Sequence, residues 1–273
     1  MNIEGGRFFY NGVKKCLINR FEHVVVPEII NINVSIDGLP LYKGSPSSFW
    51  PILVNVHEIP IFSPMMVGVF HGITKPPQLK EYLGPFVEEM NDVIENGIPI
   101  NNRVVRVRLR AFICDAPARA YIKGVVYFNA KHGCMKCCTV GEHSTHVRTV
   151  FFRDSDAPER TDELFRKMAY SDHYREYTPL LQLKIFDVIQ DVVVADRLHL
   201  IDLGVMRRLL RGWLYGAYGV TTKAQTQEQD NRVKQARPTK TTQIDANSKE
   251  KNNQTRDAHD IDENQIDIKS IEP

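Results

Sequence analysis

Three short segments near the N-terminus have the hydrophobic pattern of β-strands. Residues 30–36 (Ile-Asn-Ile-Asn-Val-Ser-Ile) alternate apolar and polar side chains, and Phe49 to His57 and Met65 to His71 are apolar runs of strand length. Alternation with period two is typical of strands that are buried on one face. The sequence predicts three consecutive strands, preceded by a short strand around Val24–Val26 that Pro27 interrupts.

An amphipathic helix is predicted after these strands. Pro76 and Pro77 precede a run with helical periodicity and Gly97 follows it, which suits the two ends of a helix. The apolar stripe of this helix consists of Leu79, Tyr82, Leu83, Phe86, Met90, Val93 and Ile94.

A fourth strand with an acidic exit follows the helix. From Arg103 onward, valine and leucine alternate with arginine; the run ends at Asp115, and a short helix is predicted from Pro117 to Ile122. The order strand, strand, strand, helix, strand, helix matches a ribonuclease-H-like α/β fold: a mixed sheet, flanked by helices, whose fourth strand lies parallel to the first. Asp37, at the end of the first strand, is therefore expected near Asp115.

The rest of the chain divides into a folded part and a tail. Residues 161–173 are predicted to be helical, and residues 186–195 to form a short buried strand or lead into a helix. Residues 221–273 lack aromatic residues and are predicted to be disordered. Residues 1–220 are expected to form one folded core. A long amphipathic helix is predicted from Leu198 to Trp213, with Leu198, Ile201, Val205, Leu209 and Leu210 facing inward and Arg207, Arg208 and Arg211 outward.

Composition and charge narrow the function only slightly. Of the 273 residues 42% are hydrophobic and 25% charged, as in ordinary globular proteins, and the net charge is +2. Nucleic acid would therefore have to bind to local patches such as the arginines at 106, 108 and 110, although outward-facing charges are commonly only solvated. No apolar run approaches the roughly 18 residues that cross a membrane, so no membrane partner is expected.

The aspartates at the strand ends have the chemistry of a Mg²⁺ or Mn²⁺ site. Two adjacent carboxylates repel unless a cation lies between them, and hard divalent ions prefer oxygen ligands. Asp37 and Asp115 would be ligands in such a site, and the alternative is that each is only a turn residue.

A Cys/His cluster within residues 125–150 suggests a structural zinc site. Cys134 and Cys137 are followed by His143 and His146, four ligands of the kind that tetrahedral Zn²⁺ takes, with His132 as a spare. The alternative is a surface loop with free thiols and solvated histidines. The total of five cysteines, without a secretion signal, favours a reducing compartment.

Asp196 and His199 form a third candidate pair. Three positions apart on a helix, they share a face and would orient each other or reach the metal site. The alternative is a helix-capping aspartate followed by a partly buried histidine.

Several of these motifs together resemble the CACTA-type (En/Spm-like) DNA transposases of animal genomes. The resemblance covers residues 7–220 and is carried, in order, by Ser-Ile-Asp-Gly-Leu-Pro-Leu-Tyr-Lys from Ser35, Ser-Ser-Phe-Trp-Pro-Ile-Leu from Ser47, Cys-Asp-Ala-Pro-Ala-Arg-Ala from Cys114, Gly-Cys-Met-Lys-Cys from Gly133 and Asp-Arg-Leu-His-Leu-Ile-Asp-Leu-Gly-Val-Met from Asp196.

The resemblance implies a ribonuclease-H-like transposase core and metal-dependent cleavage and strand transfer of DNA in the nucleus. Asp37 and Asp115 match the first two acids of the family's DDE triad, Asp196 and His199 match its Asp/Cys-x2-His signature, and Cys134 and Cys137 match its Cys-x2-Cys. The third acid, a glutamate on a helix well downstream, has no counterpart before the tail, whose acids include Glu228, Glu250, Glu263 and Glu272.

The sequence therefore predicts a C-terminally truncated, transposase-derived protein that binds DNA but cleaves it weakly or not at all. Another copy of the chain or a full-length transposase would be its protein partner. The alternatives are a non-catalytic zinc-containing module that binds DNA or protein, and a transposon remnant without a function.

Overall fold

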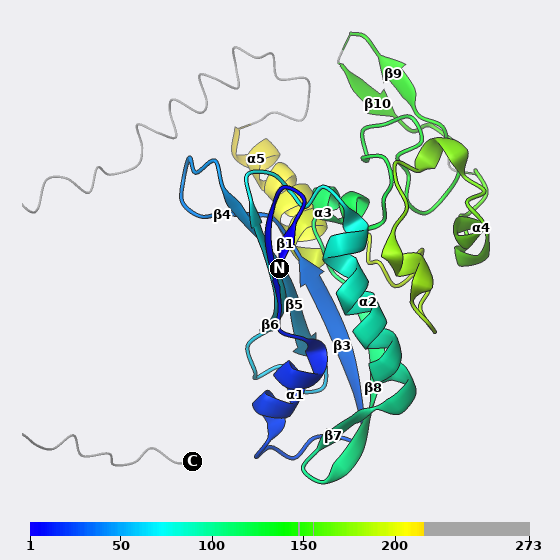
Figure 1. The fold of residues 1–273 in the computed structure, drawn as a ribbon. Helices are drawn as coiled ribbons and strands as arrows, with labels where there is room; N and C mark the ends of the chain where they lie inside the picture. The colour runs from blue at the N-terminus through cyan, green and yellow to red at the C-terminus, as the bar shows by residue number, and fades with distance from the viewer. Residues whose placement is uncertain (147, 155, 216–273) are drawn as a thin grey trace, which may run out of the picture. The chain divides into compact units, whose positions relative to one another are not determined.

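Four strands form the centre of a mixed sheet. In the computed structural model, which describes residues 1–146, 148–154 and 156–215, β3 (Ile29–Ile36) pairs antiparallel with β5 (Ser48–Val56), and β5 pairs antiparallel with β6 (Met65–Gly72). The fourth strand, β8 (Arg103–Phe112), lies parallel to β3 on its other side. The predicted strands and their pairing are confirmed (Figure 1).

Short strands extend this centre at both edges. β1 (Asn2–Ile3) and β2 (Gly6–Tyr10) continue the sheet beyond β6, β7 (Ile98–Ile100) pairs with the start of β8, and β4 (Leu39–Pro40) pairs with β5. None of the four was predicted, because each depends on a partner that is distant in sequence or on a turn. The expected strand at Val24–Val26 is wrong: this segment is irregular, and Val25 is exposed.

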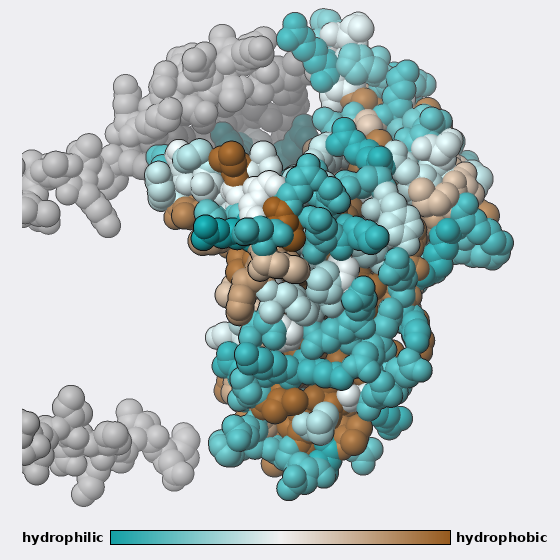
Figure 2. Space-filling model, in the orientation of Figure 1, coloured by the Kyte–Doolittle hydropathy of each residue, from teal (hydrophilic) through white to brown (hydrophobic). Residues whose placement is uncertain are grey.

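Two helices cover one face of the sheet. α2 (Leu79–Asn96) has the predicted boundaries and ends at Gly97, whose φ of 69° suits glycine. Its buried stripe packs on β8 and its outer side is mostly hydrophilic (Figure 2). α1 (Val13–Phe21) was not predicted; it lies against α2, and its first N–H groups donate to Glu89 of α2, from Val13 at 2.7 Å and from Lys14 at 3.0 Å.

The two faces of the sheet differ in burial. On β8 the side chains of Val105, Val107 and Leu109 are buried toward α2, whereas Arg106 and Arg108 on the opposite face are exposed. The same alternation runs through β3, where Ile30, Ile32, Val34 and Ile36 are buried. The main core therefore lies between the sheet and the two helices.

Residues 113–190 contain short elements. α3 (Ala116–Ile122) begins where it was predicted, and β9 (Glu142–Ser144) and β10 (Thr149–Phe151) form a hairpin. The helix expected over 161–173 is shorter: α4 spans Asp162–Arg166, and a positive φ at Met168 ends it before the short turns η1 (Ser171–His173) and η2 (Pro179–Gln182).

The helical segment after Asp196 differs from the expected helix. η3 (Arg197–Met206) is a π-helix, and α5 (Arg207–Tyr215) is an α-helix. The expectation that their apolar side chains face inward is wrong for Leu198, Ile201, Val205 and Leu210, which are exposed, while Leu209 is half-buried. A π-helix advances its side chains at a different angle from an α-helix, so the period assumed from the sequence does not apply.

The chain separates into a compact unit of Met1–Leu210 and a second unit of Arg211–Pro273. The predicted tail at 221–273 lies outside the described residues. Within residues 1–215, as far as they are described, no helix combines the length and the apolar character needed to cross a membrane.

Candidate functional site

Three neighbouring segments run in the same direction and end at the same edge of the sheet. Val34 of β3 pairs with Phe112 of β8, and Phe112 forms a parallel bridge on its other side with Val192. The N–H of Val193 donates to the carbonyl of Phe112 at 2.9 Å, and that of Phe112 to Asp191 at 2.9 Å. The residues that follow the three segments are Asp37, Asp115 and Asp196.

Asp37 lies close enough to Asp115 for their charges to interact. Its carboxylate is half-buried at the end of β3, and its Oδ1 accepts a hydrogen bond from the N–H of Gly38 at 2.7 Å. Burial raises the pKa of Asp37, the charge of Asp115 raises it further, and the Gly38 N–H and His199 oppose the rise. The two acids at the strand ends therefore lie close enough, as predicted, for one to raise the pKa of the other.

Asp115 also caps a helix. It is the residue before α3, and its Oδ1 accepts a hydrogen bond from the N–H of Ala118 at 2.8 Å. This is the turn role that the sequence left open as an alternative. The cap fixes the orientation of the carboxylate and is compatible with a ligand role, because the Ala118 contact uses only Oδ1.

Asp196 both caps a helix and orients His199. Its carboxylate accepts hydrogen bonds from the N–H groups of Leu198 at 3.3 Å and His199 at 2.7 Å, and its Oδ2 lies 2.5 Å from Nδ1 of the His199 ring. Although burial alone would raise the pKa of Asp196, the hydrogen bonds from His199 and Leu198 lower it. The capping alternative is confirmed for Asp196, but His199 is exposed and not buried.

Arg119 is a residue of this site that sequence reasoning missed. Its buried Nη1 donates to the carbonyls of Val193 at 2.8 Å, Val194 at 3.0 Å and Cys114 at 3.4 Å. Burial lowers the pKa of Arg119, whereas the charges of Asp115 and Asp196 act in the opposite sense. Arg119 therefore ties α3 to the segment that carries Asp196. An arginine within an otherwise small and apolar helix was the available signal.

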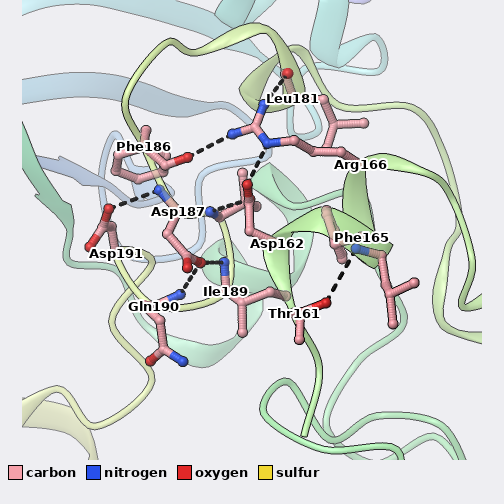
Figure 3. A network of polar contacts seen from close by, with 12 residues as sticks. Thr161, Asp162, Phe165, Arg166, Leu181, Phe186, Asp187, Ile189, Gln190 and Asp191 are labelled. Atoms are coloured by element: carbon pink, nitrogen blue, oxygen red, sulfur yellow. Dashed lines mark hydrogen bonds and ion pairs between the residues drawn. The ribbon is translucent and has the colours of Figure 1, made fainter.

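A polar network holds the segment that leads to Asp196. Asp162 of α4 accepts hydrogen bonds from Arg166 Nε at 2.5 Å and from the N–H of Val188 at 2.9 Å (Figure 3). Arg166 also donates to the carbonyls of Leu181 and Phe186. This network fixes the loop after η2 through side chains, since the loop has little regular backbone pairing of its own.

The Cys-x2-Cys motif is assembled as a close pair. Sγ of Cys134 lies 3.3 Å from Sγ of Cys137, and the N–H of Cys137 donates to the Cys134 sulfur at 3.4 Å. Burial alone would raise the pKa of Cys134, but backbone N–H groups of Lys136 and Cys137, together with Arg160, lower it. These are conditions that favour a thiolate, the form that binds metals.

The histidines of the expected zinc site are not assembled with this pair. His143 lies on β9 and His146 in the turn after it, both exposed, while the spare candidate His132 lies 3.8 Å from Asp172. Across the described ranges, no group of three or more His, Cys, Asp or Glu side chains is placed to hold a metal ion. Only the Cys134–Cys137 half of the expected set is therefore formed in this arrangement.

Two buried titratable groups were also missed by sequence reasoning. Lys123 follows α3 and its amine has no hydrogen-bond partner among the described residues; burial lowers its pKa to about 7. His173 is buried with Nδ1 2.7 Å from the carbonyl of His132, and burial lowers its pKa to about 4. Nothing in the local pattern around either residue indicates burial.

Asp37 and Asp115, the acidic pair, offer carboxylate oxygens, the ligands that hard divalent cations prefer. Both carboxylates are half-buried and mutually repelling, and both engage a backbone N–H through Oδ1. A cation between them would remove the repulsion that raises the pKa of Asp37. Asp37 and Asp115 supply two protein ligands, and the rest of the coordination sphere would come from water and substrate.

Comparison with known proteins leaves the family open: no protein-family model matches the chain, and no match is found among curated proteins.

Proposed function

We propose that the protein derives from a CACTA-type DNA transposase and that Asp37 and Asp115 hold Mg²⁺ or Mn²⁺ at its ancestral cleavage site. The observation that carries the proposal is the meeting of Asp37 and Asp115 at the ends of parallel neighbouring strands, with His199 close enough to act on Asp37. The strand order β6-β5-β3-β8 supports the ribonuclease-H-like fold that the sequence motifs imply.

In the proposed site each residue has a distinct task. Asp37 and Asp115 would hold the cation, which when bound activates a nucleophilic oxygen and stabilises the leaving one in phosphodiester cleavage. Asp196 holds Nδ1 of His199, which would leave Nε2 free for a proton or a phosphate oxygen. Arg119 positions the Asp196 segment and touches neither substrate nor cation.

We expect the proposed activity to be weak, because no residue matches the third acid of the family's catalytic triad. That glutamate has no match within residues 1–220, and the glutamates of the tail lie outside the described residues. Two carboxylates bind a divalent cation less tightly than three and leave a second ion without a ligand.

Nicking of supercoiled plasmid in Mn²⁺ tests this activity. We expect at most slow nicking by the full chain, abolished by Asp37→Asn or Asp115→Asn and retained in Asp154→Asn, which changes an exposed aspartate elsewhere. Rapid nicking that depends on Asp37 would contradict the incomplete triad. Nicking that is unchanged in both site variants would contradict the site itself.

A second candidate function, a non-catalytic zinc-containing module that binds DNA or protein, is favoured by the Cys134–Cys137 pair. The 3.3 Å separation of the sulfurs and the N–H groups that surround Cys134 are preorganised for a shared metal. We expect about one zinc per chain after purification without chelator, and loss of it in Cys134→Ser. Equal zinc content in Cys134→Ser would exclude this pair as the ligand.

A further inference from the structure

The outer edge of β8 is paired at both ends and open in the middle. Ile98 of β7 pairs with Val105, and Val192 pairs with Phe112. Between these two points, no described residue forms a backbone hydrogen bond with the outer edge of residues 106–111. At about 3.3 Å per residue, the opening accommodates an extended segment of about four or five residues.

The backbone groups at this opening belong to Val107 and Leu109. The N–H of Arg106 donates to the carbonyl of Glu28 at 2.8 Å, so Arg106 directs its backbone groups toward β3. In a strand, successive residues direct these groups to opposite edges. Val107 and Leu109 therefore present an N–H and a carbonyl each to the open edge, at the spacing of a sheet ladder.

A hollow of about 590 Å³ lies at the opening. One side of it is formed by β8 from Arg106 to Leu109 together with Asn31 of β3. The other side is formed by the end of α2 with its capping Gly97, residues 94–97, and by Ile185, which is 89% exposed. The edge is thus accessible, and the lining opposite the strand includes the apolar side chains of Ile94 and Ile185.

The charges at the hollow favour an acidic occupant. Arg106 and Arg108 are exposed on the sheet face beside it. The one acidic side chain in the lining, Glu95, pairs with Lys184 at 2.7 Å and is largely compensated. An incoming strand would place alternate side chains beside the arginines and the remaining ones against Ile94 and Ile185.

We propose that this opening, the β8 edge slot (residues 106–111 of β8 with Ile94 and Ile185), binds an extended peptide of alternating acidic and apolar residues from a partner protein. The peptide adds a strand to the sheet through the backbone groups of Val107 and Leu109. Its acidic side chains face Arg106 and Arg108, and its apolar side chains cover the exposed Ile185.

The backbone groups distinguish a peptide from nucleic acid. A phosphodiester offers only acceptors, so it would satisfy the N–H groups and arginines of the slot but not the carbonyls of Val107 and Leu109. An extended peptide offers N–H and carbonyl groups alternately and satisfies all of them. The slot is separate from the acidic pair, so the inference does not depend on metal binding or on DNA cleavage.

Titration of a fluorescent peptide tests the inference. The probe is an octapeptide in which aspartate alternates with isoleucine and valine, added to the full chain and followed by anisotropy. We expect saturable binding of this peptide. Two N-methylated versions of it should then differ in whether they bind. Methylation of one alternate set of amides abolishes binding, because those N–H groups face β8, and methylation of the other set leaves it.

A second experiment reverses the charge of the two arginines beside the slot. We expect Arg106→Glu combined with Arg108→Glu to weaken binding by about tenfold. The control Arg7→Glu changes an exposed arginine of β2, on the far side of the sheet, and should leave binding unchanged. Circular dichroism confirms that each variant is folded.

Three results would overturn the proposal. They are absence of saturable peptide binding, equal loss of binding with both methylated peptides, and binding of a poly-thymidine oligonucleotide that is tighter than that of the octapeptide, displaces it and is weakened in the Arg106→Glu, Arg108→Glu variant. The last result would identify the arginines as a phosphate-binding row.

Discussion

At the scale of residues, the raised pKa of Asp37 is the property that bears on the proposed metal site. Two parallel strands hold its carboxyl close enough to that of Asp115 for the charges to interact, which is unfavourable when both are ionised. An asparagine at this position would accept the hydrogen bond from the Gly38 N–H equally well and would carry no charge. A pair that costs stability and gains from a cation is the pattern expected of a metal site.

Asp37→Asn is expected to make the protein more stable at neutral pH. Because the pKa of Asp37 is raised in the fold, its contribution to stability is present at low pH and is lost as the pH rises through the folded pKa. Urea unfolding without metal should therefore show the advantage of the variant growing from pH 4 to pH 7. An advantage that is constant over this range would show that Asp37 has an ordinary pKa.

Lys123→Met should also stabilise the protein, by about 1–3 kcal/mol near pH 7. Between pH 7 and its ordinary pKa, Lys123 is protonated in the unfolded chain but largely neutral in the fold, so stability rises with pH over this window. The variant should lose that rise, whereas Lys80→Met, on the exposed side of α2, should keep it. Identical pH profiles for wild type and Lys123→Met would contradict the burial of this amine.

At the scale of elements, the site depends on how α3 is fixed to the segment before Asp196. Arg119 makes this connection through three carbonyls, two of them in residues 193 and 194. Without it, the three carbonyls lose this donor and the Asp196 segment loses its attachment to α3.

Arg119→Leu is therefore expected to lower the free energy of unfolding by about 2–4 kcal/mol. Urea denaturation measures this loss, and the control Arg153→Leu replaces an exposed arginine and should change stability little. A loss below about 0.5 kcal/mol would mean that the carbonyls find other donors and that Arg119 is not a positioning residue.

The elements also show which parts of the fold the sequence could predict. α2 and the strands β3, β5, β6 and β8 carry strong local patterns, and the order of these elements was enough to bring Asp37 and Asp115 together. α1 could not be predicted, because its N-terminus is capped by Glu89 of α2 and not by a neighbour in sequence. β2 likewise depends on β6.

The candidate site residues also differ in how far the sequence could predict their arrangement. Asp196 and His199 are three residues apart, so local helix geometry was enough to join them. His143 and His146 were assigned to zinc on spacing alone, but His143 lies on β9 and His146 in the turn after it, and both are exposed. Arg119 and Lys123 were missed because their burial is set by distant segments, residues 193–194 for the first and Phe165 for the second.

At the scale of the whole molecule, the compact unit of Met1–Leu210 contains the eight-stranded sheet together with Asp37, Asp115 and Asp196. Metal binding by the acidic pair should therefore be a property of this unit. Leu198, Ile201 and Val205 of η3 remain exposed next to the site, within the part that the structure describes. Strand transfer requires further ligands, whereas binding of a cation requires only the pair.

Calorimetric titration of Mn²⁺ into the full chain at pH 7 tests whether Asp37 and Asp115 bind a divalent cation. We predict saturable binding with about one ion per chain, lost in Asp37→Asn and in Asp115→Asn and retained in Asp154→Asn and in Cys134→Ser. The same binding isotherm in the wild type and in both site variants would show that these two carboxylates do not hold the ion.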